Sequence, residues 1–255
     1  MSTMVLGFLV VLLAILTAVA GLFLVQRLIP LSVRREHNDV AGFIYAVLGV
    51  AYAVLLAFSV IAVWEQFEAA KEAADREGTE LAEIYWLANR FPDSERRQVQ
   101  ELARSYAQVV TDEEWPMMAD GQASPHAWTL LDQLRGSVQN LEVSTAADQV
   151  LYDQGLSRVH DLGNARRTRL LDANAYVPTI LWVVLISGGL ITVSFTYLFG
   201  LRKSWPHVVM VGALTFVIAS VLFTTYALEY PFHGDPRVTP DALELYLQQF
   251  EGSQQ

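Results

Sequence analysis

One apolar seam runs without a break from Gly42 to Phe91, and its first half is lipophilic enough to lie in a membrane. Its members are spaced alternately by four and three residues, which is the repeat of a helix packed against partner helices. A helix of about fifty residues is about 75 Å long. The seam therefore predicts one helix that crosses a bilayer and continues into a helical domain. Its members are Gly42, Ala46, Gly49, Ala53, Leu56, Val60, Val63, Phe67, Ala70, Ala74, Glu77, Leu81, Ile84, Ala88 and Phe91, of which only Glu77 is polar.

Four long apolar runs stand out along the chain, at about 4–30, 40–65, 176–200 and 207–228. Each is longer than the roughly 18 apolar residues that cross a hydrocarbon core. The positive mean hydropathy, +0.31, agrees with this pattern. We therefore expect a multi-pass protein of the cell membrane whose first partner is the lipid bilayer.

The runs divide the chain into a first transmembrane hairpin (1–65), a soluble helical bundle (66–175), a second hairpin (176–229) and a tail with a short helix (230–255). Ser124 before Pro125, and Ser144 or Thr145, are helix start signals inside the bundle. The predicted fold is all-α, with the bundle inserted between the second and third transmembrane helices. Two long helices are expected to continue unbroken from the membrane into the bundle.

The charge of the chain limits its partners and its chemistry. The formal net charge is −10, and residues 66–175 hold 19 acidic against 11 basic residues, which argues against nucleic acid as a partner. The chain has no cysteine, and no nucleophile elbow or phosphate loop occurs. We predict neither an enzyme nor a protein with a cofactor or metal.

The sidedness rests on basic residues in the two short links between membrane helices. These links hold Arg27, Arg34 and Arg35, and then Arg202 and Lys203, which places them in the cytoplasm and the bundle outside it. As many basic residues lie at the membrane end of the bundle, but long domains follow the rule poorly. Those residues are Lys71, Arg76, Arg166, Arg167 and Arg169.

Small residues fill the membrane half of the seam, at Gly42, Ala46, Gly49 and Ala53. Small side chains let helix backbones approach closely in lipid, where packing drives association. The partner helix is either another helix of this chain or a copy of the same helix around an axis.

A polar stripe with a spacing of seven lies on the same helix. Its members are Asn38, Tyr45, Tyr52, Ser59 and Gln66. Polar groups in membrane helices face a bundle interior or a water-filled path. The stripe could line a pore in an oligomer, or it could hydrogen-bond to neighbouring helices.

Three arginines, Arg166, Arg167 and Arg169, come just before the third apolar run. Acidic residues come just after the second run, and the two clusters lie level in an antiparallel pair of helices. The arginines could form salt bridges with these acids, or they could ring a vestibule that concentrates anions. The acids are Glu65, Glu68 and Glu72.

The segment from His37 to Val50, continued by Tyr52–Phe58 and Trp64–Glu65, resembles the signature of a bacterial and plant membrane family described as bestrophin-like and of unknown function. The segment Tyr230–Asp235, with Val238 and Pro240, resembles the C-terminal motif of that family. The resemblance covers nearly the whole chain.

Bestrophins themselves are pentameric anion channels with a cytoplasmic soluble part and a neck lined by aromatic and aliphatic residues of the second helix. The resemblance thus implies that the second helix lines a path, with Tyr45, Tyr52 and Ser59 as candidates. No bestrophin neck motif is visible in the sequence, and the implied sidedness is opposite to that given by the basic residues.

Two functions follow from these features. The first is an oligomeric, bestrophin-like ion channel, with small anions passing along the second transmembrane helix. The alternative is a membrane-anchored sensor or scaffold whose helical module binds a ligand or a partner protein.

Overall fold

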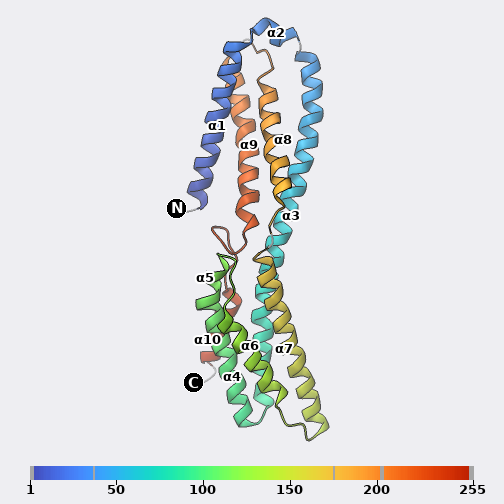
Figure 1. Cartoon of the computed structure of the whole chain (residues 1–255), viewed down its shortest axis with the longest axis vertical. Coiled ribbons are helices and arrows are strands. Elements are labelled where there is room, and N and C mark those ends of the chain that lie inside the picture. The colour runs from blue at the N-terminus through green and yellow to red at the C-terminus, as the bar shows by residue number, and fades with distance from the viewer. Residues whose placement is uncertain (1–2, 37, 175, 202–203, 253–255) are drawn as a thin grey trace. The chain divides into compact units, whose positions relative to one another are not determined.

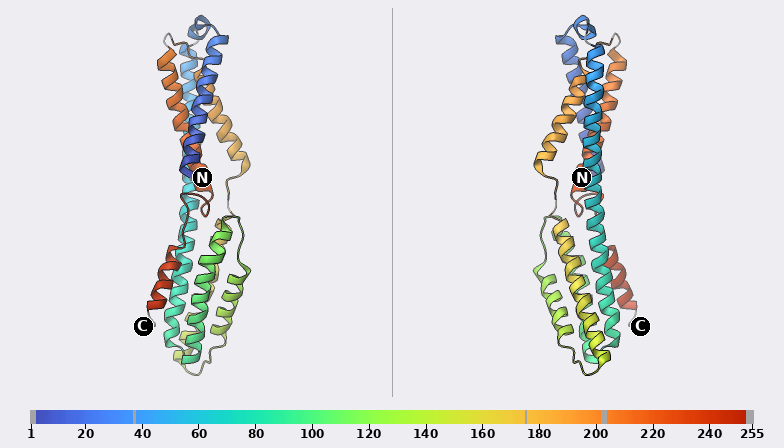
Figure 2. Two further views of the ribbon diagram at one scale, coloured as in Figure 1. Left: turned by 90° about the vertical axis from the view of Figure 1, so that its left-hand side faces the viewer. Right: turned by 90° about the vertical axis from the view of Figure 1, so that its right-hand side faces the viewer.

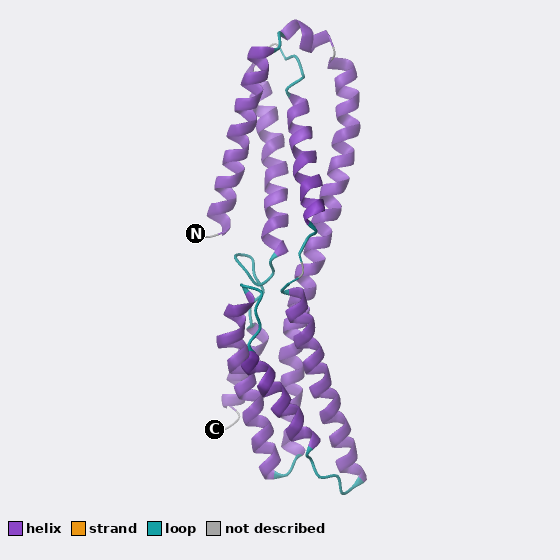
Figure 3. Cartoon of the chain, viewed as in Figure 1, coloured by secondary structure: helices purple, strands orange, loops and turns teal. Residues whose placement is uncertain are grey.

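The computed structural model describes residues 3–36, 38–174, 176–201 and 204–252, and within these ranges every regular element is a helix (Figure 3). The all-α prediction is confirmed. His37, Arg202 and Lys203, which contributed to the sequence argument, lie outside the described residues. The chain divides into two compact units. One is formed by Met1–Glu65 and Tyr176–Glu229, and the other by Gln66–Ala175 and Tyr230–Gln255. We call them the membrane unit and the bundle unit.

The membrane unit is built from the four helices that are long and apolar enough to cross a bilayer. Helix α1 runs side by side with α9, and the start of α3 lies beside α8 (Figures 1 and 2). Most large apolar side chains of these helices are exposed in the single chain, as expected for surfaces that meet lipid or other subunits. The helices are α1 (Thr3–Leu28), the short link helix α2 (Leu31–Glu36), α3 (Asn38–Leu87), α8 (Thr179–Thr196) and α9 (Ser204–Glu229).

Helix α3 is continuous over 50 residues, so the long helix predicted from the seam is confirmed. It tightens into a 3₁₀ turn, η1 (Ala88–Arg90), and stops before Pro92, which cannot donate a helical hydrogen bond. Its last six turns or so, at about 3.6 residues per turn, belong to the bundle unit, where the seam residues Ala70, Leu81 and Ile84 are almost fully buried.

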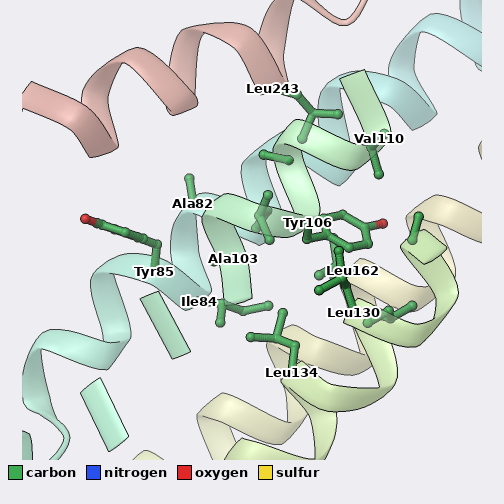
Figure 4. Packing of buried hydrophobic residues seen from close by; sticks show 14 of the residues in the cluster. Ala82, Ile84, Tyr85, Ala103, Tyr106, Val110, Leu130, Leu134, Leu162 and Leu243 are labelled. Carbon is green, nitrogen blue, oxygen red and sulfur yellow. The ribbon is translucent and has the colours of Figure 1, made fainter. Parts of the chain in front are cut away.

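The bundle unit packs α3 from Gln66 onward against three further long helices around one apolar core. Figure 4 shows Ile84 of α3, Tyr106 of α4, Leu134 of α6 and Leu162 of α7 converging there. Leu243 of α10 contributes from the tail. The remaining elements are α4 (Asp93–Val109), the π-helical turn η2 (Val110–Glu114), α5 (Trp115–Met118), α6 (Pro125–Gln139), α7 (Ala146–Asp172) and α10 (Asp241–Gly252).

Two helix starts in the bundle unit follow the predicted capping chemistry. The Ser124 hydroxyl accepts from the backbone N–H of Ala127, and Pro125 occupies the first position of α6. Thr145 and Asp148 form a reciprocal capping box at the start of α7. Both start signals are confirmed.

The second continuous helix predicted from the sequence is wrong. Helix α7 ends at Asp172 and α8 begins only at Thr179, after Pro178. Proline disfavours helical backbone at the residue before it, so Val177 cannot continue a helix into α8. Its backbone N–H instead donates to the carboxylate of Glu229 at the end of α9, 2.9 Å away. Among the described elements, α3 alone runs as one uninterrupted helix through residues of both units.

Candidate functional site

Three members of the polar stripe, Asn38, Tyr45 and Tyr52, contact α8 or the residues that follow it inside the membrane unit. Tyr52 is buried, and its hydroxyl donates to the carbonyl oxygen of Leu185 at 2.9 Å. Its ring lies against Gly188 and Gly189, where a notional Cβ would stand 2.7 Å and 2.8 Å from atoms of the Tyr52 side chain. Two consecutive glycines of α8 therefore form a notch that fits this tyrosine.

The stripe residues on either side of Tyr52 also make contacts within the chain. The Asn38 amide binds both backbone groups of Gly200, donating to the oxygen at 3.3 Å and accepting from the nitrogen at 2.9 Å. The ring of Tyr45 stacks on Phe195, 5.9 Å between centroids, and meets Phe199 edge-on. These contacts fasten α3 to α8 and to the residues that follow α8.

The lower end of the stripe is less engaged. Ser59 is buried, and its hydroxyl donates to the carbonyl oxygen of Leu55 on its own helix. Gln66 belongs to the bundle unit, and its buried Nε2 has no hydrogen-bond partner among the described residues. The geometry thus supports the intramolecular hydrogen-bonding interpretation for Asn38 and Tyr52, with Tyr45 held by ring contacts.

The small-residue face of α3 has the opposite environment. A notional Cβ at Gly42 or Gly49 would meet nothing within 4 Å, and Ala46 and Ala53 are exposed. Packing of this face against another helix of the same chain, one of the two alternatives, is therefore not found in the part of the chain that is described. This face of α3 is open among the residues that the structure describes.

A buried charge cluster of Glu77, Glu114, Arg166 and Arg169 lies in the bundle unit, and all four side chains are fully buried. Arg166 forms a bidentate salt bridge with Glu114, with N–O distances of 2.7 and 2.5 Å. Arg169 donates to Glu77 at 2.5 and 3.0 Å and to Glu114 at 2.7 Å. Two cations and two anions give no formal net charge, which makes the burial of all four tolerable.

Neutral groups complete the cluster. The Tyr106 hydroxyl donates to Glu77 at 2.6 Å, and the backbone N–H of Ser124 donates to Glu114 at 2.8 Å. The guanidinium of Arg166 lies over the Trp128 ring and that of Arg169 over the Trp115 ring, 4.6 and 4.8 Å from the centroids. Such stacking suits arginine, whose planar cation is weakly hydrated.

The electrostatics follow from burial and from the cluster's own charges. Burial, together with the negative charge of Glu77, raises the pKa of Tyr106 well above its ordinary value. Burial disfavours the charged form of Arg169, but the carboxylates of Glu77 and Glu114 outweigh this effect and raise its pKa. With the pKa values of both arginines raised, the guanidinium groups stay charged, and their salt bridges are suited to holding the helices of the bundle unit together.

The cluster corrects the expectations for the arginines. Arg166 and Arg169 do form salt bridges, but with Glu77 and Glu114 instead of the expected Glu65, Glu68 and Glu72. Because both guanidinium groups are fully enclosed in the chain, they cannot line a vestibule. Arg167 alone is exposed, and it donates to Asn164 at 2.5 Å.

Sequence reasoning missed Glu114 and Tyr106. Glu114 ends the π-helical turn that follows α4, and such turns commonly mark special positions in helices. One signal was available, because Glu77 is the only polar member of the seam and a buried carboxylate requires partners. The sequence did not indicate which residues these partners are.

The hollows of the membrane unit are apolar. One pocket beside Tyr52 has a volume of about 590 Å³ and lies between α3 and α8. Its lining includes Phe43, Val47, Leu55 and Ile191. It lacks the convergent polar groups that orient a small ligand. Within the described residues, no group of three or more metal-ligating side chains is found.

Comparison with known proteins points to one family. The Bestrophin-like domain family matches residues 12–243. No curated protein matches the chain.

Solved structures with the same fold include a mutant of a bacterial bestrophin homologue from Klebsiella pneumoniae. It has a TM-score of 0.70 and 14% identity, and the match covers 95% of this chain and 99% of that one. Another structure of a bestrophin homologue from this organism has a TM-score of 0.67 and 15% identity, with 96% and 98% covered. A structure described as a membrane protein has a TM-score of 0.68 and 15% identity, again with 96% and 98% covered. At this identity the likeness establishes the fold.

Proposed function

Because this chain belongs to the Bestrophin-like domain family, we propose that it is one subunit of an oligomeric membrane channel for small anions. The observation that carries the proposal is the open face of α3. This helix is held to α8 by its polar stripe, and its small-residue face has no partner among the described residues of the single chain. In lipid, such a face is suited to close contact with a helix of another copy.

The polar stripe is a weaker candidate for the pore lining than it was from sequence alone. Tyr52 and Asn38 use their polar groups on α8 and on the residue Gly200. We propose instead that the conducting path follows exposed residues of α3 at Phe43 and Val50, seven residues apart, which are 74% and 66% exposed. A narrow apolar stretch of this kind gates ions by excluding water.

The first test is the mass of the purified protein in mild detergent or a nanodisc, followed by chloride flux from reconstituted vesicles. We expect a ring of four or more subunits with measurable flux. Val50→Ala should change the flux, whereas Val183→Ala, at an exposed valine of α8, should not. A monomer without flux, or flux that is the same in both variants and in Phe43→Ala, would refute the proposal.

The alternative of a sensor or scaffold is supported by the continuity of α3 and the rigid buried charge cluster in the bundle unit. It is weakened by the interruption between α7 and α8, because a piston or twist signal needs continuous helices. A ligand or partner protein that binds the full chain without any ion flux would favour it.

We further propose that the bundle unit is extracytoplasmic, from the basic residues of the short links. Since the chain has no cysteine, a single cysteine introduced at exposed Arg97 reports the sidedness without background. Labelling of intact cells by an impermeant maleimide supports the proposal, and labelling only after lysis refutes it.

A further inference from the structure

A hollow of about 380 Å³ lies in the membrane unit between α1, α8 and α9. The hydroxyls of Thr17 and Thr215, which border it, donate to carbonyl oxygens of their own helices at 2.8 Å each, so they need no further partner. Leu13 and Leu190 at its border are 65% and 64% exposed, so the hollow is open to the outside of the single chain. Its other lining residues include Ala14, Val193, Ile218 and Leu222. The hollow is suited to a hydrocarbon, and lipid acyl chains surround helices that cross a bilayer.

Tyr197 borders the same hollow and carries a hydroxyl that is available for bonding. Its side chain lies against Gly21 of α1, where a notional Cβ would stand 3.1 Å from the hydroxyl oxygen. Among the described residues this hydroxyl has no hydrogen-bond partner. Tyrosine hydroxyls in apolar surroundings usually find a partner. An acceptor from outside the chain, such as an ester carbonyl, therefore suits this position.

Three arginines lie at the end of the membrane unit that carries the two short links, which we call the link end. Arg34 is only 7% exposed, and it donates to two backbone carbonyl oxygens at 3.2 and 3.3 Å. Arg27 and Arg35 are exposed, and within the described part of the chain none of the three arginines forms an ion pair. In the sequence, residues 27–39 and 200–206 together hold five basic against two acidic side chains. The link end is therefore positive, although the whole chain has a net charge of −10.

The link end has the character of a segment at a bilayer surface. A side-chain nitrogen of Gln26 in α1 lies 3.4 Å from Nδ1 of His207 in α9, so the neighbouring Arg27 is level with the start of α9. Trp205 at that start is 75% exposed, and exposed tryptophans favour the interface between bilayer and water. The arginines of the link end are thus placed where lipid headgroups lie.

The positive charge, the hydroxyl and the hollow follow one another along α1. Gly21, on which Tyr197 lies, is six residues before Arg27, which is about 9 Å at 1.5 Å per residue. The residues of α1 that border the hollow, within 10–18, lie about 14 to 26 Å from Arg27 on the same scale. A phospholipid carries its phosphate, its ester groups and its acyl chains in this order, from the surface inward. One leaflet supplies about 15 Å of hydrocarbon, which fits this spacing.

We propose that the link end binds one anionic phospholipid, with its phosphate at Arg27 and Arg35, an ester carbonyl at the Tyr197 hydroxyl and one acyl chain in the hollow. Basic side chains beside membrane helices attract anionic lipids, and guanidinium groups bind phosphate oxygens through charge-assisted hydrogen bonds. The buried charge of Arg34 adds to this attraction. The site lies within the membrane unit. It depends neither on the channel function nor on which side of the membrane the links lie.

The test is native mass spectrometry of the full-length protein in mild detergent, titrated with phosphatidylglycerol or with phosphatidylcholine of the same acyl chains. We expect saturable binding of phosphatidylglycerol, about tenfold or more tighter than that of phosphatidylcholine. Arg27→Gln and Arg35→Gln should each weaken the binding of phosphatidylglycerol by about fivefold and leave that of phosphatidylcholine unchanged. Tyr197→Phe should weaken the binding of both lipids by about two- to tenfold, because both carry the ester groups. The charge control is Arg97→Gln, at an exposed arginine of the bundle unit, which should leave both affinities unchanged.

Ala14→Phe tests the hollow, because Ala14 borders it and the new ring would fill it. This variant should weaken the binding of both lipids by about tenfold or more, since at least two methylene groups would lose their burial. The matched control is Ala20→Phe, which places the same ring at an exposed alanine of α1 outside the hollow. It should bind both lipids as the parent protein does.

The proposal is overturned if the parent protein binds the two lipids equally, or if Arg97→Gln weakens binding as much as Arg35→Gln, which would indicate only a general charge effect. Unaltered lipid binding in Ala14→Phe would overturn it as well. If that variant instead changed the mass of the oligomer, the hollow would be a contact between copies of the chain. Excess glycerol 3-phosphate should not displace the lipid, because it has no acyl chain; complete displacement would show that the site binds a free anion, not a lipid.

Discussion

Replacing Arg169 by methionine is expected to destabilise the bundle unit strongly. Methionine keeps most of the length of the side chain but removes the charge and the hydrogen bonds to Glu77 and Glu114. Glu77 is fully buried, and among the described residues it would keep only the Tyr106 hydroxyl as a hydrogen-bond donor. A carboxylate left buried without its cation is among the most costly defects in a protein interior.

The expected loss is about 3–5 kcal/mol of unfolding free energy, the usual cost of removing one partner from a buried ion pair. Denaturant unfolding of the full chain in detergent, followed by tryptophan fluorescence, measures it. Trp115 lies against the guanidinium of Arg169, and Trp128 against that of Arg166, so both rings report on the cluster. The transition should shift to lower denaturant concentration.

Two further variants identify the cause. Arg76→Gln removes an arginine that is paired with Glu72 at the surface, and it should cost about 1 kcal/mol or less. Adding Glu77→Gln to Arg169→Met removes the orphaned charge, so the double variant should be more stable than the sum of the two single losses by about 2–3 kcal/mol. The reasoning is refuted if Arg169→Met costs no more than Arg76→Gln, or if the two cluster substitutions are simply additive.

Three other substitutions test local packing and electrostatics. Gly78→Ala should loosen the packing of α10, because the new Cβ would stand 2.9 Å from the Cβ of Ala242. Amide hydrogen exchange in α10 should then become faster. The control is Gly136→Ala, whose Cβ would meet nothing within 4 Å and which should leave that exchange unchanged. Tyr52→Phe should cost about 0.6–1.7 kcal/mol by removing the hydrogen bond to α8, measured by thermal unfolding in detergent. The pKa of Asp148 is lowered from its ordinary value of 3.8, mainly by the Thr145 side chain and also by hydrogen bonds from backbone N–H groups. The ionised carboxylate therefore stabilises the fold above about pH 3.8, and this contribution is lost as the pH falls through the folded-state pKa. Thr145→Ala should therefore lower the melting temperature more at pH 7 than at pH 3.

Much of the fold could be predicted from the sequence because its signals are local. Long apolar runs leave few alternatives to membrane helices, and α3 carries its packing repeat over all its length. The starts at Ser124 and Thr145 depend on side chains within three residues of the cap. Such features need no knowledge of which segments meet in space.

The interruption between α7 and α8 shows where local signals were misread. Pro178 was present in the sequence, but the apolar residues around it suggested that the helix continued. What stabilises the extended backbone there is Glu229, distant in the chain, whose carboxylate also accepts from the Trp182 indole at 3.0 Å. The charge cluster was hidden for the same reason, because Glu77, Glu114 and Arg169 come from three separate elements.

The sequence did not show which face of α3 packs inside the chain and which face remains exposed. The proposed function depends on this distinction. In the sequence, the small residues of α3 indicated close packing against another helix, and the polar residues suggested a water-filled path beside α3. In a membrane, however, tyrosine and asparagine are stable only where they find partners, and α8 provides a backbone carbonyl and a two-glycine notch for Tyr52. Since the polar stripe holds α3 to α8, the proposed channel uses the face with Gly42 and Gly49 for contact with other copies. Substituting Gly49 by leucine should then disrupt the oligomer while leaving the monomer folded, whereas Gly188→Leu should disturb the subunit itself.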